Sequence, residues 1–227
     1  NIMKLDEKYR DLLGYLPQDF GYYPSFTANE FMMYMASLKG LNNNYSKKKI
    51  SELLHIVGLD EVKNKKIKTF SGGMKQRLGI AQAVLNDPQF NLDEPTSGLD
   101  PKERIHFRNL ISGFAKDKIV LLSTHIVSDI ESIADQIIVL KKGEIAVNGT
   151  PNVLIQQMLG KVWECLIPES ELEYASQKYC IVNQHLQSQQ VLLRIISEEK
   201  PDLEMSKAIS PTLEDLYMFY FRDENVR

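Results

Sequence analysis

The stretch FSGGMKQRLGIAQAVLNDPQFNLDEPTSGLDP, residues 70–101, decides the fold of this chain. Apolar residues at helical intervals predict a helix over residues 73–85, which the pair Asp87-Pro88 would end. Ser71, Gly72 and Gly73 open that helix, where unpaired backbone N–H groups and the helix dipole favour an anion. Alone, such a start is more often a capped tight turn. The anion-site interpretation therefore depends on neighbouring motifs, and it predicts that the backbone N–H groups of these three residues face solvent.

Acidic, amide and imidazole side chains follow three apolar runs at equivalent places. Asp93 and Glu94 end one run, His125 ends another, and Gln18 follows a third. In α/β sheets ligands bind at the carboxyl ends of the strands, so we expect these side chains along one sheet edge. Each also has an ordinary alternative: a turn acid pair, a structural histidine at a strand end, or a common Leu-Pro-Gln tripeptide.

Taken in order, four motifs resemble the ATP-binding-cassette (ABC) ATPase family. LGYLPQ, ending at Gln18, is similar to the Q-loop, and the segment from Phe70 is similar to the signature helix. LDEPTSGLDP, from Leu92, resembles the Walker B strand and D-loop, and LLSTH, ending at His125, resembles the switch histidine. The resemblance extends over about residues 15–149, and it points to the ATPase subunits of bacterial exporters.

The resemblance implies a role for each residue at the predicted sheet edge. Glu94 and His125 would be catalytic: Glu94 would polarise the water that attacks the γ-phosphorus of ATP, and His125 would donate to the γ-phosphate. Asp93 would hold hydrated Mg²⁺. Gln18 would ligate Mg²⁺ or the attacking water. ATP and Mg²⁺ are thus the expected cofactors.

The resemblance also implies a nucleotide shared between two subunits. Residues 71–73 would bind ATP held by a second ABC ATPase subunit, and Asp100, in the D-loop, would touch that subunit across the nucleotide. Phe70 and Met74 replace the outer letters of the usual LSGGQ pattern. The contacts made by the backbone and by Ser71 therefore carry over, and the glutamine contact does not.

The Walker B strand departs from the family in length. Only four residues separate Pro88 from Asp93, one fewer than the family pattern, and polar Asn91 interrupts the apolar run. Because side chains alternate along a strand, a slip of one residue would reverse their faces. Either the strand starts differently or the sequence lacks a residue.

The sequence also lacks a recognisable Walker A loop. A phosphate-cradling P-loop has Gly, four residues and then Gly-Lys followed by Ser or Thr, and none of the 12 glycines has this spacing. Gly-Lys occurs only at Gly160-Lys161, with Ile155 where the first glycine belongs. In the family this loop lies upstream of the Q-loop. We expect an ABC core without its N-terminal Walker A portion, by truncation, disorder or true loss, and expect this chain alone to be inactive.

The pattern predicts an α/β fold of the P-loop NTPase-like ABC ATPase type, N-terminally incomplete, in two domains. The core would span residues 1–150, with a helical signature subdomain at about residues 27–87. Within the core, residues 118–123 predict a fully buried parallel strand. Residues 151–227 would form a small α+β accessory domain, with strands at 162–167, 179–183 and 191–196 and a last helix at 212–221.

Composition excludes several classes of protein. The 227 residues carry 27 Lys plus Arg against 30 Asp plus Glu, so the basic excess typical of nucleic-acid binding is missing and no nucleic-acid partner is expected. No run of roughly 18 apolar residues predicts a membrane span. Cys165 and Cys180 fit neither a metal spacing nor a disulfide framework, which favours the cytosol.

The resemblance implies the cytoplasmic ATP-hydrolysing subunit of a membrane exporter, held peripherally at the inner face of the cell membrane by an integral membrane transporter subunit. The aromatic residues of 20–26 suit docking of a helix from that subunit. Lysines at 63, 65, 66 and 68 could attract anionic lipid, although a charge run is usually a solvated face. The alternatives are a soluble, non-transport ABC ATPase and a catalytically dead interaction module.

Overall fold

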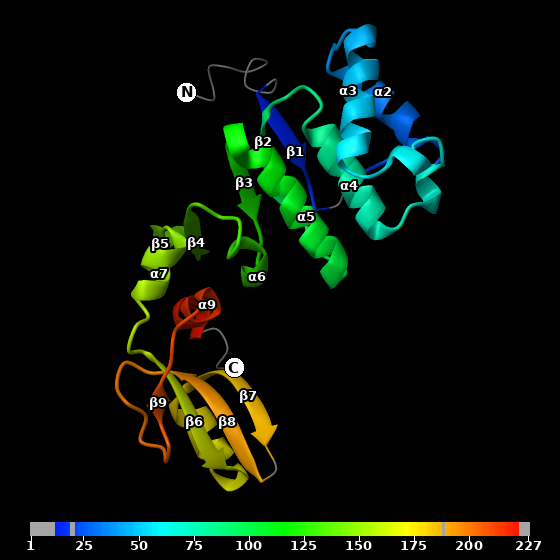
Figure 1. Ribbon diagram of the computed structural model, residues 1–227. Helices are drawn as coiled ribbons and strands as arrows, with labels where there is room; N and C mark the ends of the chain where they lie inside the picture. The colour runs from blue at the N-terminus through cyan, green and yellow to red at the C-terminus, as the bar shows by residue number, and fades with distance from the viewer. Residues whose placement is uncertain (1–11, 19–20, 188, 223–227) are drawn as a thin grey trace. The chain divides into compact units, whose positions relative to one another are not determined.

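The computed structural model describes residues 12–18, 21–187 and 189–222 (Figure 1). The chain divides into two compact units, Asn1–His125 and Ile126–Arg227, and each is described by itself. The domain boundary placed at residue 150 stays a prediction. Within the described ranges, no helix is long and apolar enough to span a bilayer.

A parallel three-stranded sheet organises the first unit. Its strand order is β1-β2-β3, with bounds Leu13–Leu16, Gln89–Asp93 and Val120–Ser123. Leu16 pairs with Leu92, and Leu92 pairs with Leu122. Leu16 and Leu92 are fully buried. The parallel pairing brings the carboxyl ends of all three strands to one edge.

The first unit's helix α4 (Gly72–Ala83) meets β1 backbone to backbone. A Cβ atom at Gly14 would lie 2.1 Å from the carbonyl oxygen of Ala83, so no other residue fits here without moving the helix. Glycine at this position therefore fixes how closely the end of α4 approaches β1.

The opposite face of the sheet carries exposed side chains among the residues of the first unit that the structure describes. Tyr15, Asn91 and Leu121 share one register row, and Tyr15 is 50% and Leu121 59% exposed. The expectation that residues 118–123 are fully buried is therefore wrong, since Ile119 is 75% exposed as well. The physical reason is position: β3 is an edge strand of the described sheet, and alternate side chains lie on this exposed face.

The helical subdomain contains two helices before α4, α2 (Ala28–Leu38) and α3 (Asn43–Ile56). Short 3₁₀ turns, η1 (Asp60–Val62) and η2 (Ile67–Thr69), lead back toward α4. Thr27 begins α2 with a capping box shared with Glu30. The core of the helical subdomain consists of buried apolar side chains from α2 and α3, among them Phe31, Met32, Ile50, Leu53 and Leu54.

The second unit begins with a hairpin and continues into an antiparallel sheet. After the short helix α6 (Val127–Ile130), the hairpin strands are β4 (Ile137–Lys141) and β5 (Glu144–Gly149). The four-stranded sheet has the order β7-β8-β6-β9. Its strands, in chain order, span Val162–Pro168, Cys180–Gln187, Gln190–Ile196 and Lys207–Ala208.

Helices lie before, within and after this sheet in the chain: α7 (Pro151–Gln156), α8 (Leu172–Lys178) and α9 (Leu213–Phe221). Arg194 on β8 pairs with Asp215 on α9 through two hydrogen bonds of 2.7 Å. The predicted strands and last helix of this region are confirmed. Strand β7 extends to Gln187, beyond the predicted end, because its last four residues are exposed and only Leu186 among them is apolar, so they give no run of apolar residues.

Candidate functional site

The candidate site lies at the carboxyl edge of the parallel sheet, as predicted. Asp93 is the last residue of β2, and Glu94 follows it. Gln18 lies two residues beyond β1, and His125 lies two residues beyond β3. The structure therefore brings the four predicted side chains to the same sheet edge, although their catalytic and ligand roles stay predictions.

Glu94 is the centre of this edge. Its carboxylate Oε1 accepts a hydrogen bond from the backbone N–H of His125 at 2.9 Å and lies 2.9 Å from the His125 Nδ1. Its Oε2 accepts a hydrogen bond from the Thr124 hydroxyl at 3.3 Å. The side chain of Glu94 is 19% exposed and that of His125 67%. The end of β3 thus orients a half-buried carboxylate toward an accessible imidazole, an arrangement suited to general-base chemistry.

The backbone of Glu94 is strained. Its φ is +44°, in the left-handed region, where a non-glycine residue costs about 1–3 kcal/mol. Its N–H donates to the Ser123 carbonyl oxygen at 2.9 Å, and its carbonyl oxygen accepts from Ser97 N–H at 3.1 Å. These bonds hold Glu94 in the turn between β2 and the D-loop. Such strain often accompanies function.

Asp93 faces β3 at the same edge. Its Oδ1 accepts a hydrogen bond from the Ser123 hydroxyl at 2.6 Å. Carboxylate and amide oxygens of the kind that Asp93 and Gln18 carry suit Mg²⁺, which usually takes one or two carboxylates and keeps several waters. Within the described ranges, no group of three or more His, Cys, Asp or Glu side chains is placed to hold a metal.

The signature helix begins where the motif predicts. Helix α4 starts at Gly72 with Ser71 as its N-cap, and the Ser71 hydroxyl accepts a hydrogen bond from Met74 N–H at 3.2 Å. It ends at Ala83, two residues before the predicted end. Ser71 and Gly72 are exposed, as expected.

Gly73, by contrast, is buried, and the expectation that it faces solvent is wrong. The reason is Glu103 on helix α5 (Pro101–Phe114): a Cβ atom at Gly73 would lie 2.5 Å from the Glu103 Cδ. Arg77 approaches the same carboxylate, with 3.5 Å between its Nε and the Glu103 Oε2. Arg77 also donates to the Val57 carbonyl oxygen at 3.2 Å. Two side chains thus join the start of α4 to α5 and to the end of α3.

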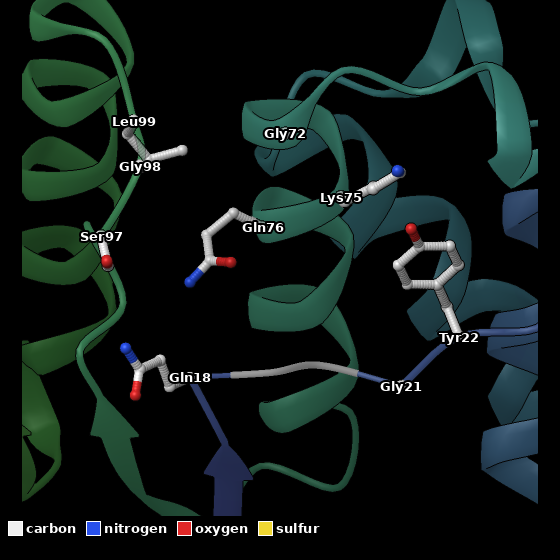
Figure 2. Close-up of a pocket in the computed structure, with 9 residues that line it drawn as sticks. All are labelled: Gln18, Gly21, Tyr22, Gly72, Lys75, Gln76, Ser97, Gly98 and Leu99. Carbon is white, nitrogen blue, oxygen red and sulfur yellow. The ribbon is translucent and has the colours of Figure 1, made fainter.

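A pocket of about 400 Å³ connects the Q-loop, the signature helix and the D-loop. Figure 2 shows Gln18, Gln76 and Ser97 around the space between α4 and the D-loop. The Gln76 amide donates to the Pro95 carbonyl oxygen at 2.6 Å, and the Lys75 ammonium lies 4.8 Å from the centre of the Tyr22 ring. The pocket is lined by Gln18, Gly21, Tyr22, Gly72, Lys75, Gln76, Ser97, Gly98 and Leu99. It therefore offers amide, hydroxyl and ammonium donors to an anion.

Asp100 has a structural partner. It is the N-cap of α5, and its carboxylate accepts a hydrogen bond from Glu103 N–H at 2.9 Å. The residue before it, Leu99, reaches the pocket, and Gly98 takes a positive φ of 72° that a side chain would oppose. The predicted contact of Asp100 with a second subunit stays a prediction.

The shortened Walker B strand starts directly after Pro88, at Gln89. Asp87 turns the chain there with a φ of +60°, and it pairs with Lys118 at the entrance to β3. The side chain of Asn91 lies outside the described residues. The alternative that the sequence lacks a residue stays open.

The sequence of this chain is similar to those of ABC transporter proteins. The family model of the ABC transporter matches residues 3–97. The chain is 44% identical over 167 residues to an uncharacterized ABC transporter ATP-binding protein of Bacillus subtilis, YxlF, covering 73% of this chain and 56% of that protein. The chain belongs to the ABC transporter ATP-binding family.

Two further relatives agree with this assignment to the ABC ATP-binding family. The linearmycin resistance ATP-binding protein LnrL of Bacillus subtilis is 34% identical, over 70% of this chain and 52% of that protein. A solved structure of an ATP-binding subunit of an ABC transporter superposes with a TM-score of 0.59 at 29% identity, covering 69% of this chain and 66% of that one. The chain spans about half the length of these two curated relatives. The mixed α/β fold of an ABC ATP-binding subunit is thus confirmed.

The contacts of Glu103 and Arg77 were not predicted from this ABC sequence. Residues 72 and 73 are both glycine, and helix propensity gives no reason for a second glycine in a first turn. That glycine was the available signal that another element packs against the start of α4.

Proposed function

We propose that this protein is the ATP-hydrolysing subunit of a membrane exporter. The observation that carries the proposal is the Glu94 carboxylate, held by His125 and Thr124 at the carboxyl edge of the sheet, beside Asp93. The relative LnrL is named a linearmycin resistance protein, which favours export over uptake as the direction of transport.

In the proposed reaction Glu94 accepts a proton from the attacking water, and His125 donates to the γ-phosphate. Asp93 and Gln18 would hold Mg²⁺, which neutralises charge on the phosphates when it is bound. Ser71, Gly72 and Gly73 would contact ATP carried by a second ABC ATPase subunit, since a helix N-terminus favours an anion. Because Gly73 is buried, Ser71 and Gly72 would make the more accessible contacts.

The proposed membrane partner would dock on an aromatic surface beside the Q-loop. Tyr23 and Tyr34 are 48% and 37% exposed, and their ring centroids lie 5.4 Å apart in an edge-on arrangement. Phe26 packs 5.1 Å from Tyr23. Exposed, clustered aromatic side chains are typical of protein interfaces. Phe20 of the predicted patch lies outside the described residues. Docking here would place the protein at the inner face of the cell membrane.

The proposal is tested by phosphate release at saturating MgATP. We expect a form extended upstream through a Walker A loop to hydrolyse ATP and its Glu94→Gln variant to lose about 10²–10⁴-fold in turnover. Glu61→Gln, a matched change on an exposed glutamate, should leave turnover unchanged.

The 227-residue polypeptide alone should release phosphate no faster than background, because it has no Gly-x₄-Gly-Lys sequence to hold the β- and γ-phosphates. Turnover by this polypeptide that disappears with Glu94→Gln would contradict that part of the proposal. Absence of turnover in the extended form would favour an interaction module instead.

A further inference from the structure

A second pocket, of about 340 Å³, lies between α2 and α3, on residues that the proposed ATPase chemistry does not use. Its lining is Asn29, Met33, Lys47, Ser51, Leu54 and Lys63. Asn29 and Met33 are four residues apart on α2, and Lys47 and Ser51 are four residues apart on α3, so each pair shares one helix face. Lys63 directly follows η1. Three separate elements therefore contribute to one hollow.

The lining has an apolar part and a polar part. Leu54 is fully buried and Met33 is half-buried. Lys47 and Lys63 contribute ammonium groups, Ser51 a hydroxyl and Asn29 an amide. No Asp or Glu is among the described residues that line the hollow. A phosphate group offers several strong acceptor oxygens and negative charge, which is the chemistry that matches such a set of donors.

The two lysines are not tightly held by acids. The Lys63 ammonium lies 3.8 Å from the Asp60 Oδ1, and the other oxygen of Asp60 lies 2.6 Å from the His55 Nδ1. An exposed ion pair with the 3.8 Å separation of Lys63 and Asp60 contributes little stabilisation. A bound anion can therefore replace Asp60 as the partner of the Lys63 ammonium at little cost. Among the residues that the structure describes, Lys47 forms no ion pair with an acidic side chain.

The four lysines between residues 63 and 68 differ in whether they line this pocket. Lys66 pairs with Glu30 at 3.5 Å, and Lys65 and Lys68 are exposed. Only Lys63 of this run lines the pocket, where it meets Lys47 from α3. The other three lysines therefore fit the interpretation of a charge run as a solvated surface, and Lys63 is the exception.

The surroundings increase the attraction for anions. Residues 42–69 contain seven lysines and three acidic residues, although the whole chain has a net charge of −3. A local basic surface on an acidic protein raises the concentration of anions near it. The pocket thus lies in the part of the helical subdomain where negative ligands gather.

We propose that the pocket between α2 and α3 binds a phosphate group, with Lys47 and Lys63 as its charged ligands. The phosphate could belong to a small soluble anion or to the headgroup of a membrane lipid. Neither source depends on the ATPase role of the sheet edge.

The test uses the 227-residue chain in two arms. In the first, inorganic phosphate and glycerol 3-phosphate are titrated by calorimetry and by amide chemical shifts. In the second, the chain is sedimented with phosphatidylcholine vesicles that contain or lack phosphatidylglycerol. The variant Lys47→Gln/Lys63→Gln should weaken binding at least tenfold. The control Lys48→Gln/Lys65→Gln removes the same charge from the same two segments outside the pocket, and should change binding less than twofold.

A second variant, Ser51→Glu, keeps both lysines and places a carboxylate in the lining, so it should also weaken binding at least tenfold. A selective loss in the titration assigns a soluble phosphate, and a selective loss only with phosphatidylglycerol vesicles assigns a lipid headgroup. Equal losses in the pocket and control pairs would mean diffuse surface attraction and overturn the proposal. Absence of binding in both arms would overturn it as well.

Discussion

Gly73 shows how one missing side chain determines the start of the signature helix. Replacing it with Ala puts a methyl group 2.5 Å from the Glu103 Cδ, so Glu103 or the helix must move. We expect Gly73→Ala to destabilise the first unit by at most about 1 kcal/mol in urea unfolding, because the atoms that must give way belong to the end of the flexible, partly exposed Glu103 side chain and their displacement loosens its pair with Arg77. The double variant Gly73→Ala/Glu103→Ala should recover part of the loss, because the shortened side chain leaves room.

Gly72→Ala is the matched control, since a Cβ atom at Gly72 meets no atom within 4 Å and the backbone is helical. It should stabilise or leave stability unchanged. Additive costs for Gly73→Ala and Glu103→Ala would show that the two residues do not press on each other.

The same residue marks the limit of prediction at this scale. Motif spacing located Ser71, Asp93, Glu94 and His125 correctly at a helix start and a sheet edge, because these positions follow from local periodicity and parallel strand order. The burial of Gly73 comes from Glu103, thirty residues later in the chain. The second glycine signals that something packs against the start of α4, but the sequence does not show that the neighbour is Glu103.

At the scale of elements, the pair of Arg194 and Asp215 holds α9 to β8. Burial opposes ionisation of the fully buried Asp215, but hydrogen bonds from Arg194 and Thr212 outweigh it and keep the pKa of this carboxyl below its ordinary value. A lowered pKa stabilises the fold above the pKa of the unfolded chain, and this stabilisation is lost as the pH falls from about 4 through the folded-state value.

Asp215→Asn should therefore cost about 3 kcal/mol at pH 7, because it leaves the Arg194 charge without its partner. The difference from the unaltered protein should shrink below pH 4, where Asp215 itself becomes protonated. Fluorescence of the single tryptophan, Trp163 on β6, reports unfolding of this unit. Glu214→Gln, on the exposed side of the same helix, is the control; an equal cost there, or one independent of pH, would contradict this account.

Helices and strands were easier to predict than the burial of their side chains. The β-branched and leucine run of residues 118–123 predicted a strand, and β3 is one. The same run predicted full burial, and that was wrong, since burial depends on what covers the sheet. Helix ends moved by only a few residues because caps such as Ser71 and Thr212 are local signals.

At the scale of the whole molecule, the exposed sheet face should make the chain prone to association. Ile119 and Leu121 expose apolar surface at β3, on the face opposite the buried Leu92 row, and Tyr15 is exposed on the same face at β1. Exposed apolar surface of this kind binds dyes and other chains. We expect Ile119→Lys/Leu121→Lys to lower the fluorescence of bound anilinonaphthalene sulfonate and to reduce light scattering at high protein concentration.

The matched control is Leu159→Lys, which removes a leucine that is 63% exposed in the second unit. It should change dye binding little, because Leu159 is not part of the sheet face. Unchanged dye fluorescence in the Ile119 and Leu121 variant would show that the face does not present a binding surface.

The contact at Gly14 has a mechanical consequence. Because backbone meets backbone there, no layer of side chains lies between β1 and the end of α4 to absorb a small displacement. Gln18 follows β1, and residues 71–73 open α4, so the Q-loop and the signature motif belong to two elements whose backbones are in direct contact. A displacement of β1 along this contact therefore moves α4 by nearly the same distance.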